Sequence, residues 1–306
     1  MVASKDMPPR TEGFGSTFFK NQFRTTIPIP TRKEADVTGK VAIVTGANSG
    51  LGLESSKQLL ALGLSRLTIA VRSPSRGEAA ASKLRLAYPK AAIDVWALDM
   101  ESYQSVQDFV RRCDSHLSQI DIVILNAGGM AFKFRKAPNG HEQAVQVNYL
   151  STVLLVLLLV PILKAKSSAS ATPPHITVVS SIMGHLAKWT KRNAKPLLPS
   201  FDDEKIPYSE YQERYGVSKQ LGQLFLVKLT DYVKADDVII NMVDPGLTKG
   251  TRLAASLPIY LKPLYAVFLG VAARPVNRGA ATYIDAAVIQ GKESHGCFLL
   301  NCGIAP

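Results

Sequence analysis

Tyr215 and Lys219 are the two side chains whose types and spacing most directly suggest proton chemistry. They stand four positions apart in a predicted helix, so they share one helix face with Cβ atoms about 5–6 Å apart. A free tyrosine ionises near pH ~10, and a neighbouring ammonium lowers that pKa, each unit representing ~1.36 kcal/mol. The pair therefore suits a phenol that exchanges a proton near neutrality. The same spacing also arises by chance on helix surfaces, so its meaning depends on the rest of the chain.

A glycine-rich turn supplies that context. The segment Thr45-Gly46-Ala47-Asn48-Ser49-Gly50-Leu51-Gly52 joins an apolar run to a predicted helix. Glycine permits a tight turn and lets a pyrophosphate approach the helix N-terminus, where unpaired N–H groups and the helix dipole favour an anion. The spacing G-x-x-x-G-x-G differs from the more widespread G-x-G-x-x-G. Its position directly after the first strand nevertheless predicts a dinucleotide site, which we expect to include Asn48, Ser49 and Leu51.

The end of the second predicted strand indicates which dinucleotide binds. An acidic side chain there would bond the ribose hydroxyls and mark NAD, whereas this strand ends in Ala70-Val71-Arg72-Ser73. Arg72, with Arg76 one turn further along, offers guanidinium groups that can grip a phosphate in charge-assisted, bidentate fashion. We therefore predict NADP(H), held at its 2′-phosphate by Arg72 and Arg76. The alternative for Arg72 is a solvent-facing residue at a strand end.

The elements that must position these residues follow an α/β pattern. From Lys40 onward, short apolar runs alternate with longer helical stretches, which is typical of a parallel sheet with helices on both faces. The predicted strands are Val41–Thr45, Leu67–Val71, Ile93–Leu98, Ile122–Leu125, Ile176–Ser180, Val238–Val243 and Cys297–Leu300. The predicted helices span about 51–62, 75–87, 102–117, 139–163, 209–235 and 276–290. The sequence thus predicts a mostly or fully parallel seven-stranded sheet.

Taken in order along the chain, these motifs resemble the classical short-chain dehydrogenase/reductase family over about residues 38–303. The matching positions are Thr45, Gly46, Gly50 and Gly52 in the cofactor turn; Asp99, with Met100, beside the adenine; Asn126-Ala127-Gly128 after the fourth strand; Asn148, Ser181, Tyr215 and Lys219 in the catalytic set; and Pro245-Gly246-Leu247-Thr248 in the loop that holds the nicotinamide carboxamide. The resemblance implies a single Rossmann-type, doubly wound domain. Its pattern is similar to the retinol-dehydrogenase-like branch and to fungal secondary-metabolite reductases.

The resemblance also implies a mechanism. Tyr215 would exchange a proton with the substrate oxygen while a hydride passes between the nicotinamide and the substrate carbon. Ser181 would orient that oxygen, and Lys219 would lower the pKa of Tyr215 and bind the nicotinamide ribose. Asn148 would hold a water that returns protons through Lys219. Family members commonly assemble as homodimers or homotetramers through helices that correspond here to 139–163 and 209–235.

The predicted function is therefore that of an NADP(H)-dependent oxidoreductase. We expect it to interconvert a ketone and a secondary alcohol on a fairly large apolar small molecule, as a reductase in secondary metabolite biosynthesis. Two alternatives use the same scaffold, as a cyclase or as a non-catalytic cofactor-sensing protein. Nucleic-acid binding rests only on the net charge, because no basic stripe or aromatic platform supports it.

Three segments depart from a compact version of this fold. Residues 1–38 read as an N-terminal arm before a domain at 39–306, and the arm's Phe14, Phe18, Phe19 and Phe23 are expected to pack in a groove of that domain. Insertions near 182–207 and 250–275 are predicted to border the substrate. The first carries a basic patch, Lys188, Lys191, Arg192 and Lys195, whose alternatives are selection of an acidic substrate and a solvated loop.

Composition limits the remaining possibilities. The 306 residues hold 46% hydrophobic and 20% charged residues, which fits a globular chain and excludes disorder. The formal net charge of +12 suits phosphate-bearing ligands but selects none. Three cysteines without metal-ligand spacing indicate no metal site and a reducing compartment, and no targeting signal is evident, so we expect a cytoplasmic protein. The apolar run that ends near Pro161 and Lys164 is expected to be too short to span a membrane.

Overall fold

One sheet of eight strands organises the protein, in the order β3-β2-β1-β4-β5-β6-β7-β8. The computed structural model describes residues 2–130, 133–167, 172–205, 208–251, 257 and 259–306. The strands are β1 (Val41–Thr45), β2 (Arg66–Val71), β3 (Ala92–Ala97), β4 (Ile122–Leu125), β5 (His175–Val179), β6 (Ile239–Asp244), β7 (Phe298–Leu300) and β8 (Gly303–Ala305). Every strand predicted from the sequence is present, and its ends lie within about one residue of their predicted positions.

The first seven strands run parallel, and β8 pairs antiparallel with β7. The prediction of seven strands was therefore one short. Asn301 and Cys302, both with positive φ, turn the chain back for the three residues of β8, a strand too short to leave a pattern in the sequence. Strand β1 lies between β2 and β4, so the chain changes direction across the sheet at this point. Ligands of such sheets bind beyond the carboxyl ends of the strands at this switch.

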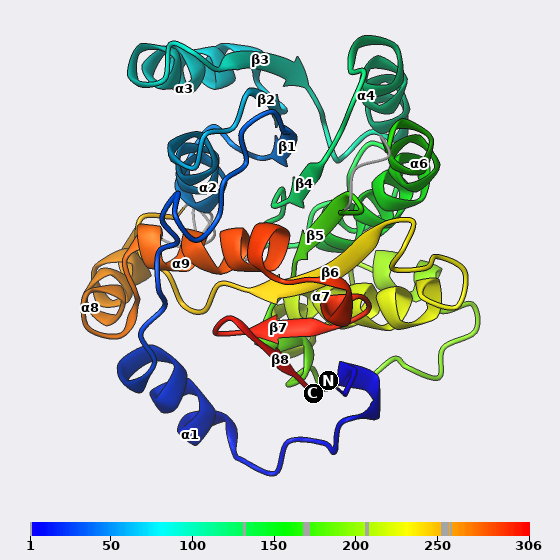
Figure 1. Ribbon diagram of the computed structural model, residues 1–306. Coiled ribbons are helices and arrows are strands. Elements are labelled where there is room, and N and C mark those ends of the chain that lie inside the picture. The colour runs from blue at the N-terminus through cyan, green and yellow to red at the C-terminus, as the bar shows by residue number, and fades with distance from the viewer. Residues whose placement is uncertain (1, 131–132, 168–171, 206–207, 252–256, 258) are drawn as a thin grey trace.

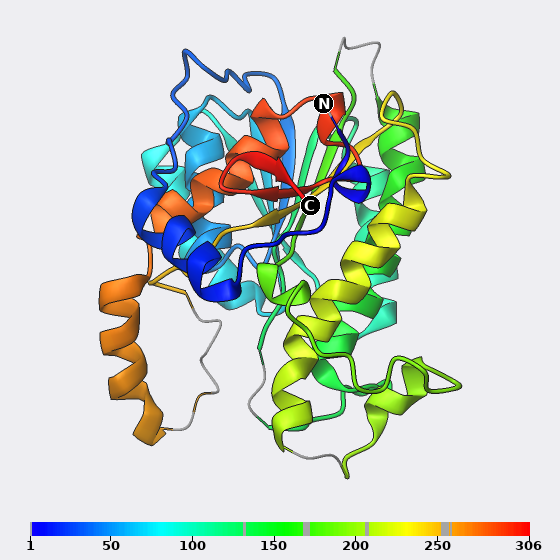
Figure 2. The same ribbon diagram turned by 90° about the horizontal axis from the view of Figure 1, so that it is seen from below.

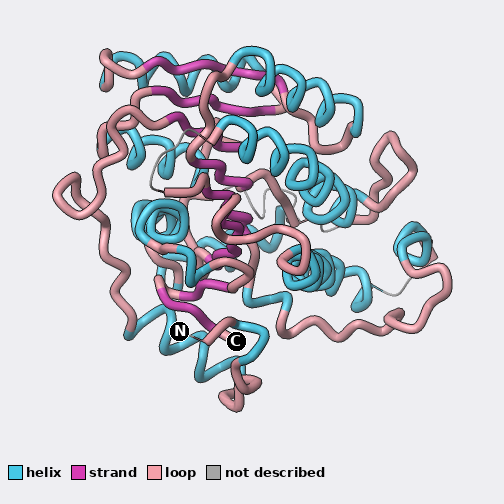
Figure 3. Tube along the Cα trace, turned by 45° about the vertical axis from the view of Figure 1, so that its right-hand side comes forward, coloured by secondary structure: helices cyan, strands magenta, loops and turns pink. Residues whose placement is uncertain are grey.

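Helices cover both faces of the sheet, as predicted (Figures 1 and 3). On one face lie α2 (Gly50–Ala61), α3 (Pro74–Ala87) and α9 (Val276–Ile284), the last continued by a π-helical turn at Asp285–Ile289. Leu59 and Tyr283 are fully buried there against strand residues such as Val44. On the other face lie α4 (Tyr103–His116), α6 (Ser151–Lys166) and α7 (Tyr208–Leu229), which bury Phe109, Leu155 and Leu226.

The helix through α6 begins and ends a few residues later than its predicted span of 139–163. It runs continuously from α5 (Gln143–Val145) through a π-helical turn, η3 (Gln146–Leu150), to Lys166, and Pro161 lies inside it. By length and composition alone this helix could cross a membrane, so the expectation that the run is too short was wrong. Leu155, Leu159 and Leu163 are completely buried in the core beneath the sheet. Its apolar character is therefore explained in large part by packing within the domain.

The N-terminal arm is more ordered than its sequence suggested. It contains η1 (Ser4–Asp6), α1 (Phe14–Phe19) and a π-helical turn, η2 (Lys20–Arg24), and it passes along the edge of the domain near β7 and β8 (Figure 2). The Ser4 hydroxyl accepts the Phe298 N–H of β7 at 2.9 Å. Phe18 stacks on Phe268 with ring centroids 6.3 Å apart. The other three arm phenylalanines are about half exposed, so the expected packing in a groove holds only for Phe18.

The two predicted insertions fold differently. In the first, η4 (Ile182–Gly184) and η5 (Leu198–Asp202) bring the buried Phe201 against Val145 and Val217. Within its basic patch, Lys191 pairs with Asp203 at 3.7 Å. The second contains η6 (Ile259–Leu261) and α8 (Lys262–Ala272), which projects from the main body (Figure 2). Parts of both insertions, 206–207, 252–256 and 258, lie outside the described residues. Their contact with a substrate stays a prediction.

Candidate active site

The glycine turn presents a helix N-terminus that suits an anion. Gly46 and Gly50 adopt positive φ values of +67° and +58°, which side chains rarely tolerate. Ser49, the N-cap of α2, makes no side-chain capping hydrogen bond. The first N–H groups of a helix have no partner within it, so those of α2 remain available to a ligand. The residues present therefore fit a dinucleotide pyrophosphate at this point.

The segment after β4 holds the glycine turn in place. Asn126 donates from Nδ2 to the Thr45 carbonyl oxygen at 2.9 Å, and the Ala127 N–H donates to Thr45 Oγ1 at 2.9 Å. A Cβ on Gly52 would lie only 2.5 Å from Asn126 Nδ2 and 2.8 Å from the Gly46 carbonyl oxygen. Glycine at position 52 is thus required by close packing of the turn on the strand ends. The predicted roles of Thr45 and Asn126 are at least partly structural.

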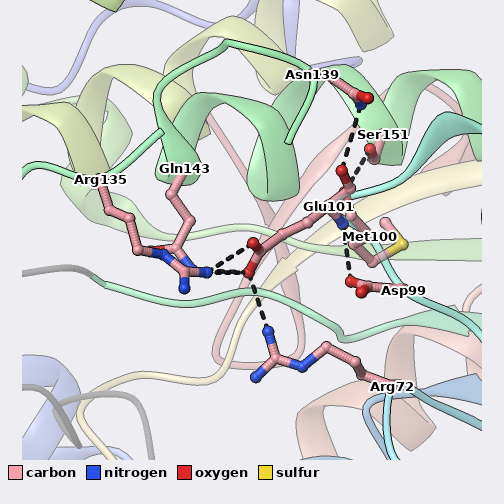
Figure 4. A network of polar contacts seen from close by, with 8 residues as sticks. All are labelled: Arg72, Asp99, Met100, Glu101, Arg135, Asn139, Gln143 and Ser151. Carbon is pink, nitrogen blue, oxygen red and sulfur yellow. Dashed lines mark hydrogen bonds and ion pairs between the residues drawn. The ribbon is translucent and has the colours of Figure 1, made fainter. Parts of the chain in front are cut away.

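Beside this turn, the structure brings together the residues predicted to hold the adenosine end (Figure 4). Asp99 follows β3, and its Oδ1 accepts the Glu101 N–H at 3.0 Å. Met100 is buried, and its carbonyl oxygen accepts the Ser151 hydroxyl at 2.6 Å. Arg72 donates from Nη1 to Glu101 Oε1 at 2.9 Å. Arg76 lies exposed in the first turns of α3 and makes no ion pair among the described residues.

Ser181, Tyr215 and Lys219 meet beyond the carboxyl end of β5. All three are buried, each with 8% of its surface exposed. Ser181 caps η4 and hydrogen-bonds the Tyr215 hydroxyl. Lys219 donates from Nζ to the Val179 carbonyl oxygen at 2.7 Å, and Nζ lies 5.8 Å from the Tyr215 ring centroid. The predicted catalytic serine, tyrosine and lysine therefore form one cluster.

Asn148 lies next to this cluster, but its side chain hydrogen-bonds Gly129 and Ser218. It lies in η3, where Nδ2 donates to the Gly129 carbonyl oxygen at 2.9 Å and to Ser218 Oγ at 3.0 Å. Its Oδ1 accepts the Gly129 N–H at 3.0 Å. Asn148 thereby ties the segment after β4 to α7. A Cβ on Gly128 would lie 3.0 Å from Asn148 Oδ1 and 3.6 Å from Lys219 Nζ, so only a small residue fits between them.

The loop after β6 is fixed from behind. Thr248 is buried, and its hydroxyl donates to the Gly246 carbonyl oxygen at 3.1 Å. Gln22 of the arm donates from Nε2 to the Leu247 carbonyl oxygen at 2.8 Å. The backbone N–H of Arg274 also donates to the Leu247 carbonyl oxygen, at 2.9 Å. The Pro245–Thr248 loop is therefore held between the arm and the segment that precedes α9.

Comparison with known proteins agrees with this arrangement. A family model described as short chain dehydrogenase matches residues 40–191. The short chain dehydrogenase/reductase mfmJ of Annulohypoxylon moriforme is 47% identical, over 100% of this chain and 88% of that protein. The short chain dehydrogenase virL of Hypocrea virens is 43% identical, over 94% and 83%.

The chain belongs to the short-chain dehydrogenase/reductase family. Proteins of this family are oxidoreductases that use nicotinamide cofactors. Solved structures share the fold: Pseudomonas aeruginosa RhlG, from an NADP active-site complex, has a TM-score of 0.64 at 22% identity, covering 87% of this chain and 96% of that one. The NADPH-dependent 3-quinuclidinone reductase from Rhodotorula rubra has a TM-score of 0.65 at 19% identity, covering 95% and 97%.

Asp244 is a site residue that the sequence analysis missed. It ends β6 next to the Pro245–Thr248 loop, is 4% exposed, and its Oδ1 accepts the Gly246 N–H at 3.2 Å. Burial raises its pKa to about 6. Burial first, and then the nearby Asp244 charge, raise the pKa of Tyr215, while the Ser181 hydrogen bond lowers it; the net shift is opposite to the lowering expected from Lys219. An acid at the end of a fully buried strand was the signal available in the sequence.

This short-chain dehydrogenase/reductase should lose activity as the pH rises through about 8. Burial lowers the pKa of Lys219 to about 8, and Asp244 acts in the opposite direction. Lys219 is an ammonium below this pH and a neutral amine above it, so on the alkaline side it no longer carries a proton to pass to Tyr215. We expect kcat/KM, which reports the free enzyme, to fall above about pH 8. In Asp244→Asn the fall should move to lower pH; an unmoved alkaline limb would contradict the assignment to Lys219.

Proposed function

We propose that the protein is an NADP(H)-dependent reductase that converts a ketone on a fairly large apolar small molecule into a secondary alcohol, within secondary metabolite biosynthesis. The observation that carries this proposal is the buried cluster of Ser181, Tyr215 and Lys219 beyond β5, beside the glycine turn. The similarity of the chain, along nearly its whole length, to curated short chain dehydrogenases of fungi supports the same proposal.

In this proposal the chain's own residues manage one proton and one oxygen atom. A bound reduced nicotinamide would supply the hydride. Tyr215 donates its phenolic proton to the carbonyl oxygen. Ser181 Oγ accepts the Met183 N–H at 3.2 Å, which leaves the serine hydrogen to be donated to the same oxygen. Burial raises the pKa of Tyr215, so the phenol carries its proton at neutral pH and has it to give.

Lys219 and Asn148 are proposed to return that proton from solvent. A small hollow between α6, α7 and the sheet is lined by Asn148, Ser218 and Lys219 together with apolar side chains. It supports the proposal because Lys219 and Asn148 line the same space. The side chain of Asn148 is occupied by Gly129 and Ser218, so its own part would be to hold the walls of this hollow. Lys219 would pass the proton on to Tyr215.

The preference for NADP(H) rests on Arg72. Replacing it with alanine removes a charge-assisted contact to the 2′-phosphate, and such contacts are worth ~1.5–3 kcal/mol. We expect the KM for NADPH to rise about 10–100-fold while the KM for NADH changes little. Glu101 keeps Arg135 and Gln143 as partners in this variant, so no buried charge is stranded. Steady-state kinetics with both cofactors check this result, and equal losses for both cofactors would contradict it.

The experiment that tests the function itself uses the purified protein, NADPH and a panel of ketones of increasing apolar surface. Consumption of NADPH that depends on the ketone, with recovery of the matching alcohol, is the expected result. Tight NADPH binding without turnover across the panel would instead favour a cofactor-sensing protein.

Assembly and location remain parts of the proposal. Leu157 of α6 and Leu224 of α7 are 48% and 53% exposed, which supports a homodimer or homotetramer through these helices. Light scattering in solution would decide it. The free thiols of Cys113, Cys297 and Cys302 are consistent with a reducing compartment such as the cytoplasm.

A further inference from the structure

A second arginine lies against the carboxylate that holds Arg72. Glu101 follows β3, and its side chain is only 10% exposed. Its Oε1 accepts Arg72 Nη1 at 2.9 Å and Arg135 Nη2 at 2.5 Å, while Oε2 accepts the same Arg135 nitrogen at 2.6 Å. Both guanidinium groups bond one oxygen atom, so they converge on the Glu101 carboxylate from two directions (Figure 4). Arg135 comes from the segment between β4 and α5, far from Arg72 in sequence.

Arg135 is held in position rather than carried on a free loop. The Gln143 N–H donates to the Arg135 carbonyl oxygen at 2.9 Å, and Gln143 Nε2 donates to Glu101 Oε1 at 2.9 Å. The backbones of Lys136 and Glu142 form an isolated antiparallel β-bridge across the same turn. Asn139 donates to the Glu101 carbonyl oxygen at 3.3 Å. The backbone and the side-chain target of Arg135 are thus both fixed before any ligand arrives.

The cluster retains positive charge and open donors. Arg72, Arg135 and Glu101 together carry one positive charge. The side chains of Arg72 and Arg135 are 58% and 54% exposed, which leaves much of each fork open to solvent. Each guanidinium has five N–H donors, and Arg135 spends one nitrogen on Glu101. Ordinary surface ion pairs contribute little, whereas two guanidinium groups held at one carboxylate offer the charge-assisted donors that a phosphate accepts.

The position of the cluster identifies the phosphate. It lies directly after Asp99, at the adenosine end of the expected dinucleotide. We propose that Arg135 joins Arg72 in binding the 2′-phosphate of NADP(H), with both guanidinium groups held by Glu101. This inference rests on the proposed NADP(H) function and adds to it a residue from outside the β2 end.

Binding of two nucleotides tests the inference without turnover. Adenosine 2′,5′-bisphosphate carries the 2′-phosphate, adenosine 5′-monophosphate lacks it, and calorimetry measures both affinities. We expect Arg135→Ala to weaken binding of the bisphosphate by about tenfold or more and to leave binding of the monophosphate unchanged. Arg135→Lys, which keeps the charge but loses the fork, should fall between wild type and Arg135→Ala. Arg111→Ala, which removes an exposed arginine paired with Asp108 on α4, is the matched control and should change neither affinity.

The outcomes separate this inference from the proposed function. If the wild-type protein binds both nucleotides equally, the NADP(H) preference itself fails. A second outcome is that wild type prefers the bisphosphate, with Arg72→Ala weakening bisphosphate binding and Arg135→Ala leaving it unchanged. In that case only the role of Arg135 is overturned. If Arg135→Ala and Arg135→Lys each weakened binding of the bisphosphate and of the monophosphate by the same factor, Arg135 would have only a structural role. Thermal unfolding of each variant, compared with wild type, confirms that the fold is retained.

Discussion

Tyr215→Phe should bind NADPH as wild type does and turn over about 100–10,000-fold more slowly. The substitution keeps the buried ring and removes only the hydroxyl that hydrogen-bonds Ser181. The variant therefore loses the proton donor while the packing of α7 on η4 stays the same. Ser181 can still orient the carbonyl oxygen, which accounts for a small residual rate. The measurement is single-turnover oxidation of NADPH at saturating ketone, beside a fluorescence titration of the cofactor.

A matched tyrosine separates loss of the donor from general disturbance. Tyr265 of α8 is close enough to Tyr215 for its charge to raise the pKa of Tyr215. We assign it no part in proton transfer, so Tyr265→Phe should keep turnover within a few-fold of wild type. If Tyr215→Phe retained wild-type turnover, another group would have to be the acid.

Arg274→Leu should lower the free energy of unfolding by about 3–5 kcal/mol. Arg274 is 7% exposed, and its Nη2 donates to the Asn21 carbonyl oxygen at 2.8 Å, to Asn301 Oδ1 at 3.0 Å and to Gln22 Oε1 at 3.2 Å. It is also a buried positive charge near Asp244, and it lowers the pKa of that carboxyl group. Leucine would leave three acceptors unpaired and Asp244 without this neighbour. Urea unfolding followed by circular dichroism measures the change.

Arg278→Leu is the control for this prediction. Arg278 also reaches the arm, through the Ile27 carbonyl oxygen, but it is only partly buried, and this is the one hydrogen bond that its side chain donates to the arm among the described residues. Its loss should cost about 1 kcal/mol. Equal small losses in the two variants would show that the arm and the Pro245–Thr248 loop do not depend on Arg274.

Buried periodic segments were predictable because hydrophobic burial dominates there. Strands β1 and β4 have their predicted bounds, since every residue from Ala42 to Thr45 and from Ile122 to Leu125 is buried. Short or irregular elements were not. The six residues of α1 are set by docking on the domain rather than by an apolar stripe, and the π-helical turn at Asn148 leaves no pattern in the sequence.

The candidate site divides in the same way. Motif residues that follow strands, such as Ser181 after β5 and Asp99 after β3, could be placed because the carboxyl ends of parallel strands share one edge. Residues that act through tertiary contacts could not. Arg135 and Glu101 are 34 positions apart, and nothing in their neighbouring sequence announces that they meet. Gln22 likewise became visible only when the fold brought it to the Pro245–Thr248 loop.

The most direct test of hydride transfer by this protein follows an isotope. Wild-type protein is incubated with a ketone that it consumes and with NADPH deuterated at the transferable position of the nicotinamide ring, in separate samples for the two faces of the ring. Mass spectrometry of the alcohol should find deuterium on the carbinol carbon from one labelled face and none from the other. Product that forms without deuterium from either face would contradict the account, because the chemistry would then be cyclisation or another reaction on the same scaffold.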